Sequence, residues 1–228
     1  MSTIDLSRIQ AVLFDIDGTL ADTDDQAVRF AARLLAPLSI VSAQGDPKVL
    51  ARRLIMAAEG PLNALINLAD HFMLDEVIGP GLEELDRIRA GPAGAQPALI
   101  PGVEDLLTNL SPRVPLAIVT TRGRERTRRF LADSHLDRFF GVVVTARSTR
   151  RIKPHPEPVR RAAEQLGVGP QACLIVGDTT VDIRSGRAAG AQTVGVLCGF
   201  GEREELERAG ADLILSTTAD LASIFLQT

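Results

Sequence analysis

The sequence predicts an α/β protein in which helices cover both faces of a parallel β-sheet. Two observations lead to this fold class: continuous apolar runs rich in valine and isoleucine, and amphipathic stretches between them. Continuous apolar runs are typical of parallel strands, which are buried on both faces. The chain has 228 residues, of which 45% are hydrophobic and 24% charged, and this is enough for one core with a smaller inserted domain.

The predicted elements alternate along the chain. Strands are predicted at 11–13, 116–119, 142–145, 174–176 and 193–196. Residues 157–166 carry an apolar stripe at helical spacing, and Gly167 follows as a helix terminator. Alternating strands and helices of this kind favour a Rossmann-like core.

The stretch 22–95 differs from the rest of the chain. It has apolar stripes at helical spacing, for example at Leu62, Leu65, Ile66, Ala69, Phe72 and Met73, and no good strand candidate. The Gly- and Pro-rich segment 91–97 then leads back to strand-rich sequence. We therefore predict a discontinuous α/β core at 1–21 and 96–228, with an inserted α-helical cap domain at 22–95.

Charge and hydropathy limit the partners. The net charge of −4 disfavours a nucleic-acid partner, and no run of apolar residues is long enough to predict a membrane span. The first residues lack the apolar stretch of a signal peptide, so we expect a cytoplasmic protein, either a monomer or a homodimer. Acidic residues such as Glu125 and Asp133 occur in the region of the arginines at 122, 124, 126, 128 and 129, which are interpreted as a solvated helix face.

Polar side chains follow the predicted strands at the points where the strands end. Asp15 and Asp17 come directly after the first strand, and Thr120 and Thr121 follow the second. Lys153, Asp178 and Asp182 follow later strands. Because the functional crevice of an open parallel sheet lies beyond the carboxyl ends of its strands, we expect one crevice to collect these residues.

The residue types in this set indicate a chemistry. Clustered carboxylates repel one another unless a cation is present, and Mg²⁺ suits oxygen ligands of this kind. A lysine and the backbone amides around Gly18 and Thr121 complement an anionic group with several oxygens. The set therefore predicts metal-assisted phosphoryl transfer.

The same motifs resemble the haloacid dehalogenase superfamily, in particular its phosphatases with a helical cap inserted after the first motif. The resemblance rests on Asp15-x-Asp17-Gly18-Thr19, Thr120, Lys153 before Pro154, and Gly177-Asp178-x-x-x-Asp182. The segment Gly199-Phe200-Gly201 and the residues after it are similar to phosphoglycolate phosphatases. The resemblance covers nearly the whole chain and implies a phosphatase for a small phosphorylated metabolite of the phosphoglycolate kind.

The resemblance also implies a role for each residue. Asp15 is the expected nucleophile, which forms an aspartyl-phosphate, and Asp17 the expected general acid and base. Thr120, the Thr121 amide, Gly18 and Lys153 are expected to bind phosphate. Mg²⁺ is expected to be held by Asp15, the Asp17 carbonyl and Asp178, with Asp182 orienting a metal-bound water. Thr121 departs from the asparagine that many relatives carry, and residues 26–90 contain no signature that fixes one substrate.

Other interpretations stay open on sequence grounds. A phosphosugar mutase of the same superfamily would use the same aspartyl-phosphate, and a non-catalytic phospho-acceptor or binding protein would keep the fold. A carbon–halogen hydrolase is disfavoured because it would need no metal-binding carboxylates. Taken alone, the threonines at 120 and 121 would serve equally well as a helix cap before Gly123. Asp178 as a simple helix N-cap is the less favoured alternative for that residue.

Overall fold

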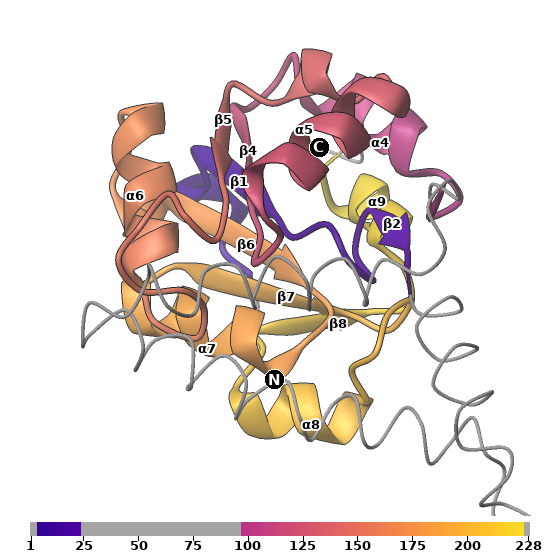
Figure 1. Cartoon of the computed structure of the whole chain (residues 1–228). Helices are drawn as coiled ribbons and strands as arrows, with labels where there is room; N and C mark the ends of the chain where they lie inside the picture. The colour runs from indigo at the N-terminus through magenta and orange to yellow at the C-terminus, as the bar shows by residue number, and fades with distance from the viewer. Residues whose placement is uncertain (1–3, 24–96, 226–228) are drawn as a thin grey trace, which may run out of the picture. The chain divides into compact units, whose positions relative to one another are not determined.

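The computed structural model describes residues 4–23 and 97–225, and all structural statements below concern these residues (Figure 1). Residues 4–22 and 98–225 belong to one compact unit. The predicted cap at 22–95 lies almost entirely outside the described residues, so its helices and the predicted domain boundaries remain predictions. Among the described residues, no helix is long and apolar enough to cross a membrane.

Six parallel strands form the sheet, which confirms the predicted fold class. They are β1 (Ala11–Phe14), β4 (Leu116–Val119), β5 (Val142–Val144), β6 (Cys173–Gly177), β7 (Gln192–Val196) and β8 (Leu213–Leu215). Their order across the sheet is β5-β4-β1-β6-β7-β8. A separate antiparallel pair joins β2 (Ala21–Asp22) to β3 (Ala98–Leu99). The edge strand β8 was not predicted, because its half-buried residues form too short an apolar run to stand out.

Helices alternate with the strands. The α-helices are α4 (Val103–Leu110), α5 (Arg124–Asp133), α6 (Glu157–Leu166), α7 (Thr180–Ala189), α8 (Arg203–Ala209) and α9 (Leu221–Phe225). Short 3-10 helices occur at η1 (Leu6–Arg8), η2 (Asp137–Phe139), η3 (Pro170–Ala172) and η4 (Thr218–Asp220). Helix α6 has the predicted bounds, and Gly167 ends it with a φ of 73°, a left-handed conformation that favours glycine.

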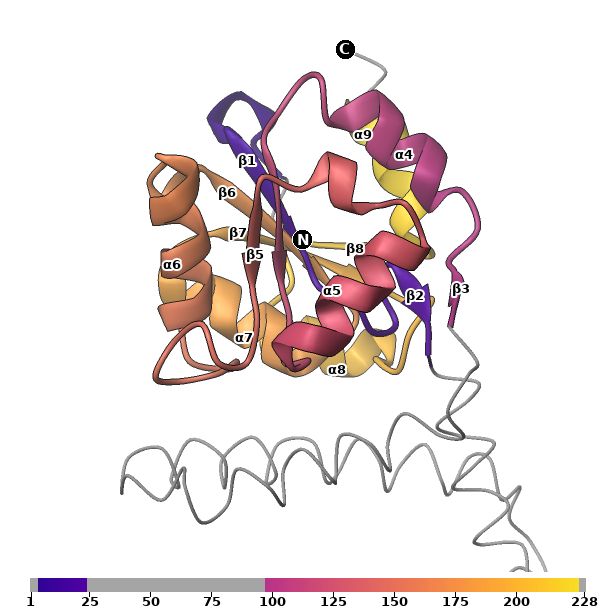
Figure 2. The same cartoon turned by 45° about the horizontal axis from the view of Figure 1, so that its top comes forward.

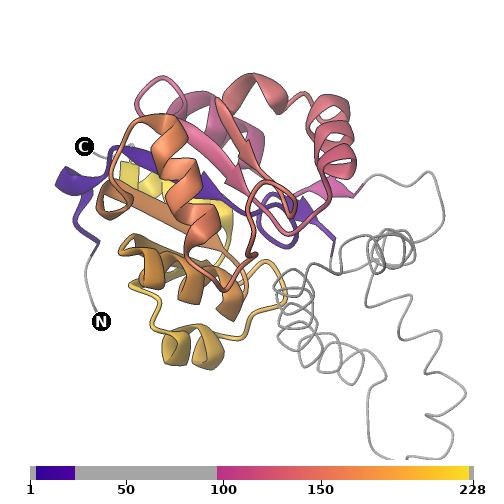
Figure 3. The ribbon, with the colours of Figure 1, turned by 60° about the vertical axis from the view of Figure 1, so that its left-hand side comes forward.

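The sheet separates two apolar cores, because successive side chains of a strand point to opposite faces. In β1, Val12 and Phe14 pack into the core under α4, α5 and α9, and α9 lies beside α4 (Figure 2). Ala11 and Leu13 pack into the core under α6 and α7, which lie side by side along the other face (Figure 3). Burial on both faces explains why β1 is a continuous apolar run.

The strand register brings three strand ends level with one another. Phe14 of β1 pairs with Ile118 of β4 and with Val176 of β6. The chain passes from β1 to β4 and β5 on one side of the sheet and then to β6 on the other, so β1 stands at the switch in direction. Ligands of open α/β sheets bind at such a switch point, beyond the carboxyl ends of the strands.

Candidate active site

A tight turn follows β1 and shapes the site. The carbonyl of Ile16 accepts hydrogen bonds from the amides of Thr19, Leu20 and Ala21, at 3.2, 2.9 and 2.9 Å. Gly18 has a φ of 69°, and a Cβ there would lie 2.3 Å from Asp178 Oδ2, so only glycine fits both the turn and its neighbour. The Gly18 amide, which we expected to bind phosphate, donates to the Ala21 carbonyl at 2.9 Å in this structure.

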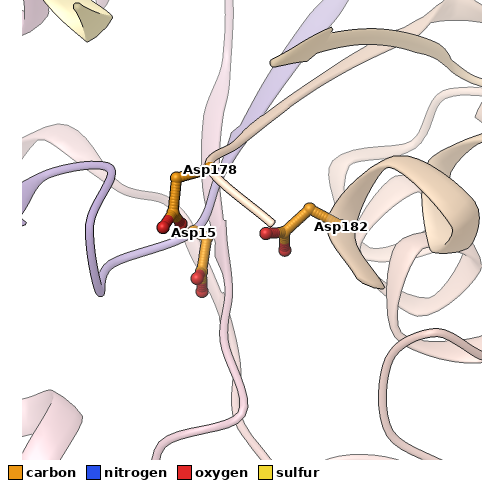
Figure 4. A group of neighbouring side chains, drawn as sticks. All are labelled: Asp15, Asp178 and Asp182. Carbon is orange, nitrogen blue, oxygen red and sulfur yellow. The ribbon is translucent and has the colours of Figure 1, made fainter. Parts of the chain in front are cut away.

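Three buried carboxylates meet beside this turn (Figure 4). Asp15 follows β1, Asp178 follows β6, and Asp182 lies in the first turn of α7. One carboxylate oxygen of each lies within 4.8 Å of one oxygen of each of the others. Of the four residues predicted to hold a metal, the structure thus brings together the side chains of three; the fourth, Asp17, was expected to offer its carbonyl.

Lys153 lies against this cluster and is itself buried, with 2% of its side chain exposed. Its Nζ lies 2.9 Å from Asp15 Oδ1 and donates hydrogen bonds to Asp182 Oδ1 at 2.6 Å and to the Val119 carbonyl at 2.9 Å. Burial alone would lower the pKa of this lysine, but Asp15 and Asp182 outweigh burial and raise the pKa above its ordinary value. Lys153 is therefore a permanent cation next to Asp15.

Asp15 has an oxygen that needs a further partner. Lys153 attracts Oδ1 as an ion pair, but none of the described residues donates a well-aligned hydrogen bond to this buried atom. Burial raises the pKa of Asp15 to about 6; Lys153 opposes this rise, whereas Asp182 and Asp17 add to it. A buried carboxylate with an unsatisfied oxygen beside two other carboxylates fits a site for a hard divalent cation, which would favour the ionised form.

Asp182 already has partners for both carboxylate oxygens. Its Oδ1 accepts from Lys153, and its Oδ2 accepts from the Thr179 amide at 3.1 Å and the Thr179 hydroxyl at 2.7 Å. The Thr179 contacts form a capping box at the start of α7. Asp182 thus orients Lys153 and caps a helix, and its part in metal binding stays a prediction.

Asp178 is held by groups to which the sequence analysis assigned no role. Its Oδ1 accepts from the Thr19 hydroxyl at 3.2 Å, and its Oδ2 accepts from the Phe200 amide at 2.8 Å. A Cβ on Gly199 would lie 2.2 Å from Oδ2, so the loop after β7 packs directly onto the carboxylate. Thr19 and Gly199 belong to the motifs discussed above, but neither was expected to position a metal ligand.

Thr120 and Thr121 follow β4, as predicted. Thr120 is buried, and its hydroxyl oxygen accepts a hydrogen bond from the Arg122 amide at 3.2 Å. Thr121 is half-buried. Gly123 is the N-cap residue of α5, so neither threonine occupies the capping position that was the simpler alternative.

Arg122 corrects one interpretation of the sequence. Its side chain is only 5% exposed and forms an ion pair with Asp17, with Nε donating to Oδ2 at 2.6 Å and Nη2 donating to Oδ1. It precedes α5, whereas Arg128 and Arg129 lie on that helix and pair with Glu125 at the surface, as expected for a solvated face. The position of Arg122 before Gly123, at a strand end rather than on the helix, was the available signal.

The structure thus places buried carboxylates and a lysine at the carboxyl ends of parallel strands, where ligands of open α/β sheets bind. The chain matches the model of the family described as haloacid dehalogenase-like hydrolase over residues 12–196. It therefore belongs to the haloacid dehalogenase-like hydrolases, and the predicted enzyme class, a phosphatase-type hydrolase, is confirmed at the level of this family.

Relatives and solved structures agree with this assignment. The chain is 32% identical to the pyrophosphatase PpaX of Anoxybacillus flavithermus, over 95% of this chain and 97% of that protein. It is also 32% identical to the pyrophosphatase PpaX of Bacillus pumilus, over 96% and 97%. A haloacid dehalogenase-like hydrolase from Streptococcus pneumoniae shares the fold, with a TM-score of 0.71 and 24% identity over 96% of this chain and 99% of that one.

A protein named as a predicted phosphoglycolate phosphatase from Haemophilus somnus is also similar in structure. Its TM-score is 0.65, at 20% identity over 95% of this chain and 98% of that one. At identities below 25%, these two structures show the fold alone.

Proposed function

We propose that this protein is a magnesium-dependent phosphatase that hydrolyses a small phosphorylated compound through an aspartyl-phosphate on Asp15. The observation that carries the proposal is the environment of Asp15 Oδ1: a buried oxygen 2.9 Å from a buried lysine, lacking a well-aligned donor among the described residues. A permanent cation offsets the charge of an attacked phosphoryl group, and a carboxylate needs no deprotonation to act as a nucleophile at neutral pH.

The donor set suits magnesium. Asp15, Asp178 and the Asp17 carbonyl would hold the ion directly, and Asp182 would act through Lys153 and a bound water. When bound, Mg²⁺ would neutralise phosphate oxygens and reduce their repulsion with the carboxylates. It would also favour the ionised form of Asp15, whose pKa of about 6 in the metal-free protein is high for an aspartate.

In the proposed first step, an Asp15 carboxylate oxygen attacks the phosphorus as the bond to the leaving-group oxygen breaks. The leaving oxygen takes a proton from Asp17, where its basicity requires one. Lys153 and the Thr120 hydroxyl offset the charge on the other phosphate oxygens. Water then attacks the phosphorus of the aspartyl-phosphate and gives a proton to Asp17, which releases inorganic phosphate and regenerates Asp15.

Pyrophosphate is the first substrate to test, because the PpaX relatives are named for that activity. Its leaving group is phosphate itself. Phosphoglycolate, which the sequence resemblance suggests, is the second, and its leaving group is an alkoxide. A substrate of either kind is small and anionic.

The proposal is tested by measuring phosphate release from pyrophosphate, phosphoglycolate and a panel of monoesters, first with Mg²⁺ and then with a chelator. We expect turnover of at least one substrate that the chelator abolishes and added Mg²⁺ restores. Turnover that persists without metal, or none on any substrate, would contradict the proposal. A strict requirement for a sugar bisphosphate would favour the mutase instead.

A further inference from the structure

Arg122 has no part in the steps above, yet it is buried and bound to a residue that does. We propose that Arg122 is a positioning residue, which holds the ionised Asp17 carboxylate in the orientation in which it accepts a proton from the attacking water. This inference rests on the proposed function of Asp17. It adds a residue to the site without giving that residue a contact with the substrate.

The geometry of the pair is specific. Nε of Arg122 donates to Asp17 Oδ2 at 2.6 Å, and Nη2 donates to Oδ1. Two parallel hydrogen bonds from a planar guanidinium fix the plane of the carboxylate as well as its position. A lysine in the same place would provide the charge but would leave this plane free to rotate.

Arg122 is itself fixed at several points. Its amide donates to the Thr120 hydroxyl at 3.2 Å, and its carbonyl accepts from the Ala146 amide at 3.1 Å. The guanidinium carbon lies 5.1 Å from the centre of the Phe130 ring, a buried ring on α5, which is within the range of a cation–π contact. An arginine anchored at both backbone and side chain is suited to orient another residue.

The pair also joins two loops of the site. Asp17 belongs to the turn after β1, which carries the proposed nucleophile, and Arg122 belongs to the loop after β4, which carries Thr120. The Asp17 side chain is 36% exposed, so the core packs around it much less tightly than around Asp15. Two hydrogen bonds to Arg122 restrain it. A shift of about 1 Å in a catalytic group costs roughly 100-fold in rate.

The first experiment compares Arg122→Met and Arg122→Lys with Arg128→Met, a matched control on the exposed face of α5. For each variant, kcat and KM are measured with p-nitrophenyl phosphate and pyrophosphate in Mg²⁺. We expect both Arg122 variants to lose roughly 10- to 100-fold in kcat with KM nearly unchanged, and Arg128→Met to match the wild type. A higher KM at unchanged kcat would mean that Arg122 binds substrate, and full activity in Arg122→Lys would mean that charge alone suffices; either result overturns the proposal.

The second experiment asks whether Arg122 acts through Asp17. Single-turnover rates of inorganic phosphate release from p-nitrophenyl phosphate are compared for Asp17→Asn, Arg122→Met and the double variant. We expect the Arg122 change to add little loss once Asp17 is gone, because residues that act as a unit are not additive. Independent, multiplicative losses would overturn the proposal.

Failure of this inference is distinguishable from failure of the proposed function. If the wild type releases no phosphate in Mg²⁺, the function fails; if the wild type is active and Arg122→Met equals it, only the inference fails. Thermal melting of each variant checks folding. Should Arg122→Met not fold, Arg122→Lys and its double variant with Asp17→Asn carry the same comparison.

Discussion

Lys153 Nζ lies 2.6 Å from Asp182 Oδ1, and both side chains are almost completely buried. The same ammonium group lies 2.9 Å from Asp15 Oδ1 on its other side. Asp182 thus connects the start of α7 to the carboxylate that we propose as the nucleophile. It stabilises the helix and the cation together, so its loss has two separable effects.

Asp182→Asn should reduce both activity and stability. We expect a loss of about 1–3 kcal/mol in the free energy of unfolding, because Lys153 loses a charged partner and α7 loses part of its cap. Asp220→Asn is a matched control, since Asp220 forms the same capping box with Thr217 at η4. The control should lose stability in urea denaturation but keep its phosphatase rate. Equal loss of activity in both variants would show that Asp182 acts only through stability.

Asp15→Asn should abolish turnover while the fold persists. Asparagine is not a nucleophile at this site, so we expect kcat to fall by roughly 10³-fold or more. Asp105→Asn, a change of the same type on the exposed side of α4, should leave kcat unchanged. The measurement is phosphate release, with circular dichroism as the check on folding. Substantial activity in Asp15→Asn would refute the assigned nucleophile.

Gly18→Ala should weaken the metal site through Asp178. The new Cβ would lie 2.3 Å from Asp178 Oδ2, so the carboxylate must move. Gly167→Ala is the control, because Gly167 has a similar φ of 73° but no atom within 4 Å of the added Cβ. Both variants should lose about 1 kcal/mol in the free energy of unfolding, because alanine is strained at a positive φ. Only Gly18→Ala should raise the Mg²⁺ concentration needed for half-maximal activity, by roughly tenfold; equal Mg²⁺ curves for the two variants would contradict this.

In the metal-free protein, the contribution of Asp15 to stability should fall as the pH rises from about 4 to about 6.5. The pKa of Asp15 is about 6 in the folded state and near its ordinary value of 3.8 in the unfolded chain. The unfolded chain therefore releases this proton first, and its ionisation favours unfolding over this range. We expect Asp15 to account for a loss on the order of 1–3 kcal/mol.

The difference between wild type and Asp15→Asn in chelator, measured by urea denaturation at several pH values, isolates this effect. The wild-type free energy of unfolding should fall relative to that of the variant as the pH rises. Added Mg²⁺ should reverse the fall, since a cation favours ionised Asp15. Parallel pH curves in chelator would show that the Asp15 pKa is not raised.

The sequence was sufficient to predict the fold class, and it singled out the three carboxylates and the lysine that the structure brings together. Apolar runs such as 116–119 predict strands reliably because both faces of the sheet are buried, and Gly167 marks a helix end because its conformation favours glycine. Asp15 and Asp178 stand out in the sequence because each is a polar residue directly after an apolar strand, at the edge of the sheet where ligands bind. These signals are local, so a single chain reveals them.

Contacts between distant segments could not be predicted in the same way. Arg122 looks like one more surface arginine until its guanidinium is seen against Asp17 and Phe130. The donor of the hydrogen bond from Phe200 to Asp178 is a backbone amide, and any residue type other than proline would provide it, so the sequence does not indicate this contact. Such contacts depend on loop conformation, and loop conformation is set by packing between segments far apart in the chain.

The buried hydrogen bond from the Thr218 hydroxyl to the Thr19 carbonyl, at 2.6 Å, joins segments 199 residues apart. Together with Gly199 and Phe200 at Asp178, it makes the turn after β1 dependent on residues that are synthesised long after the turn itself. A nascent chain that already contains Asp15, Lys153 and Asp178 therefore still lacks Gly199 and Phe200, which contact the Asp178 carboxylate. We therefore expect the turn after β1 to reach its final geometry only once the chain has been synthesised through Thr218.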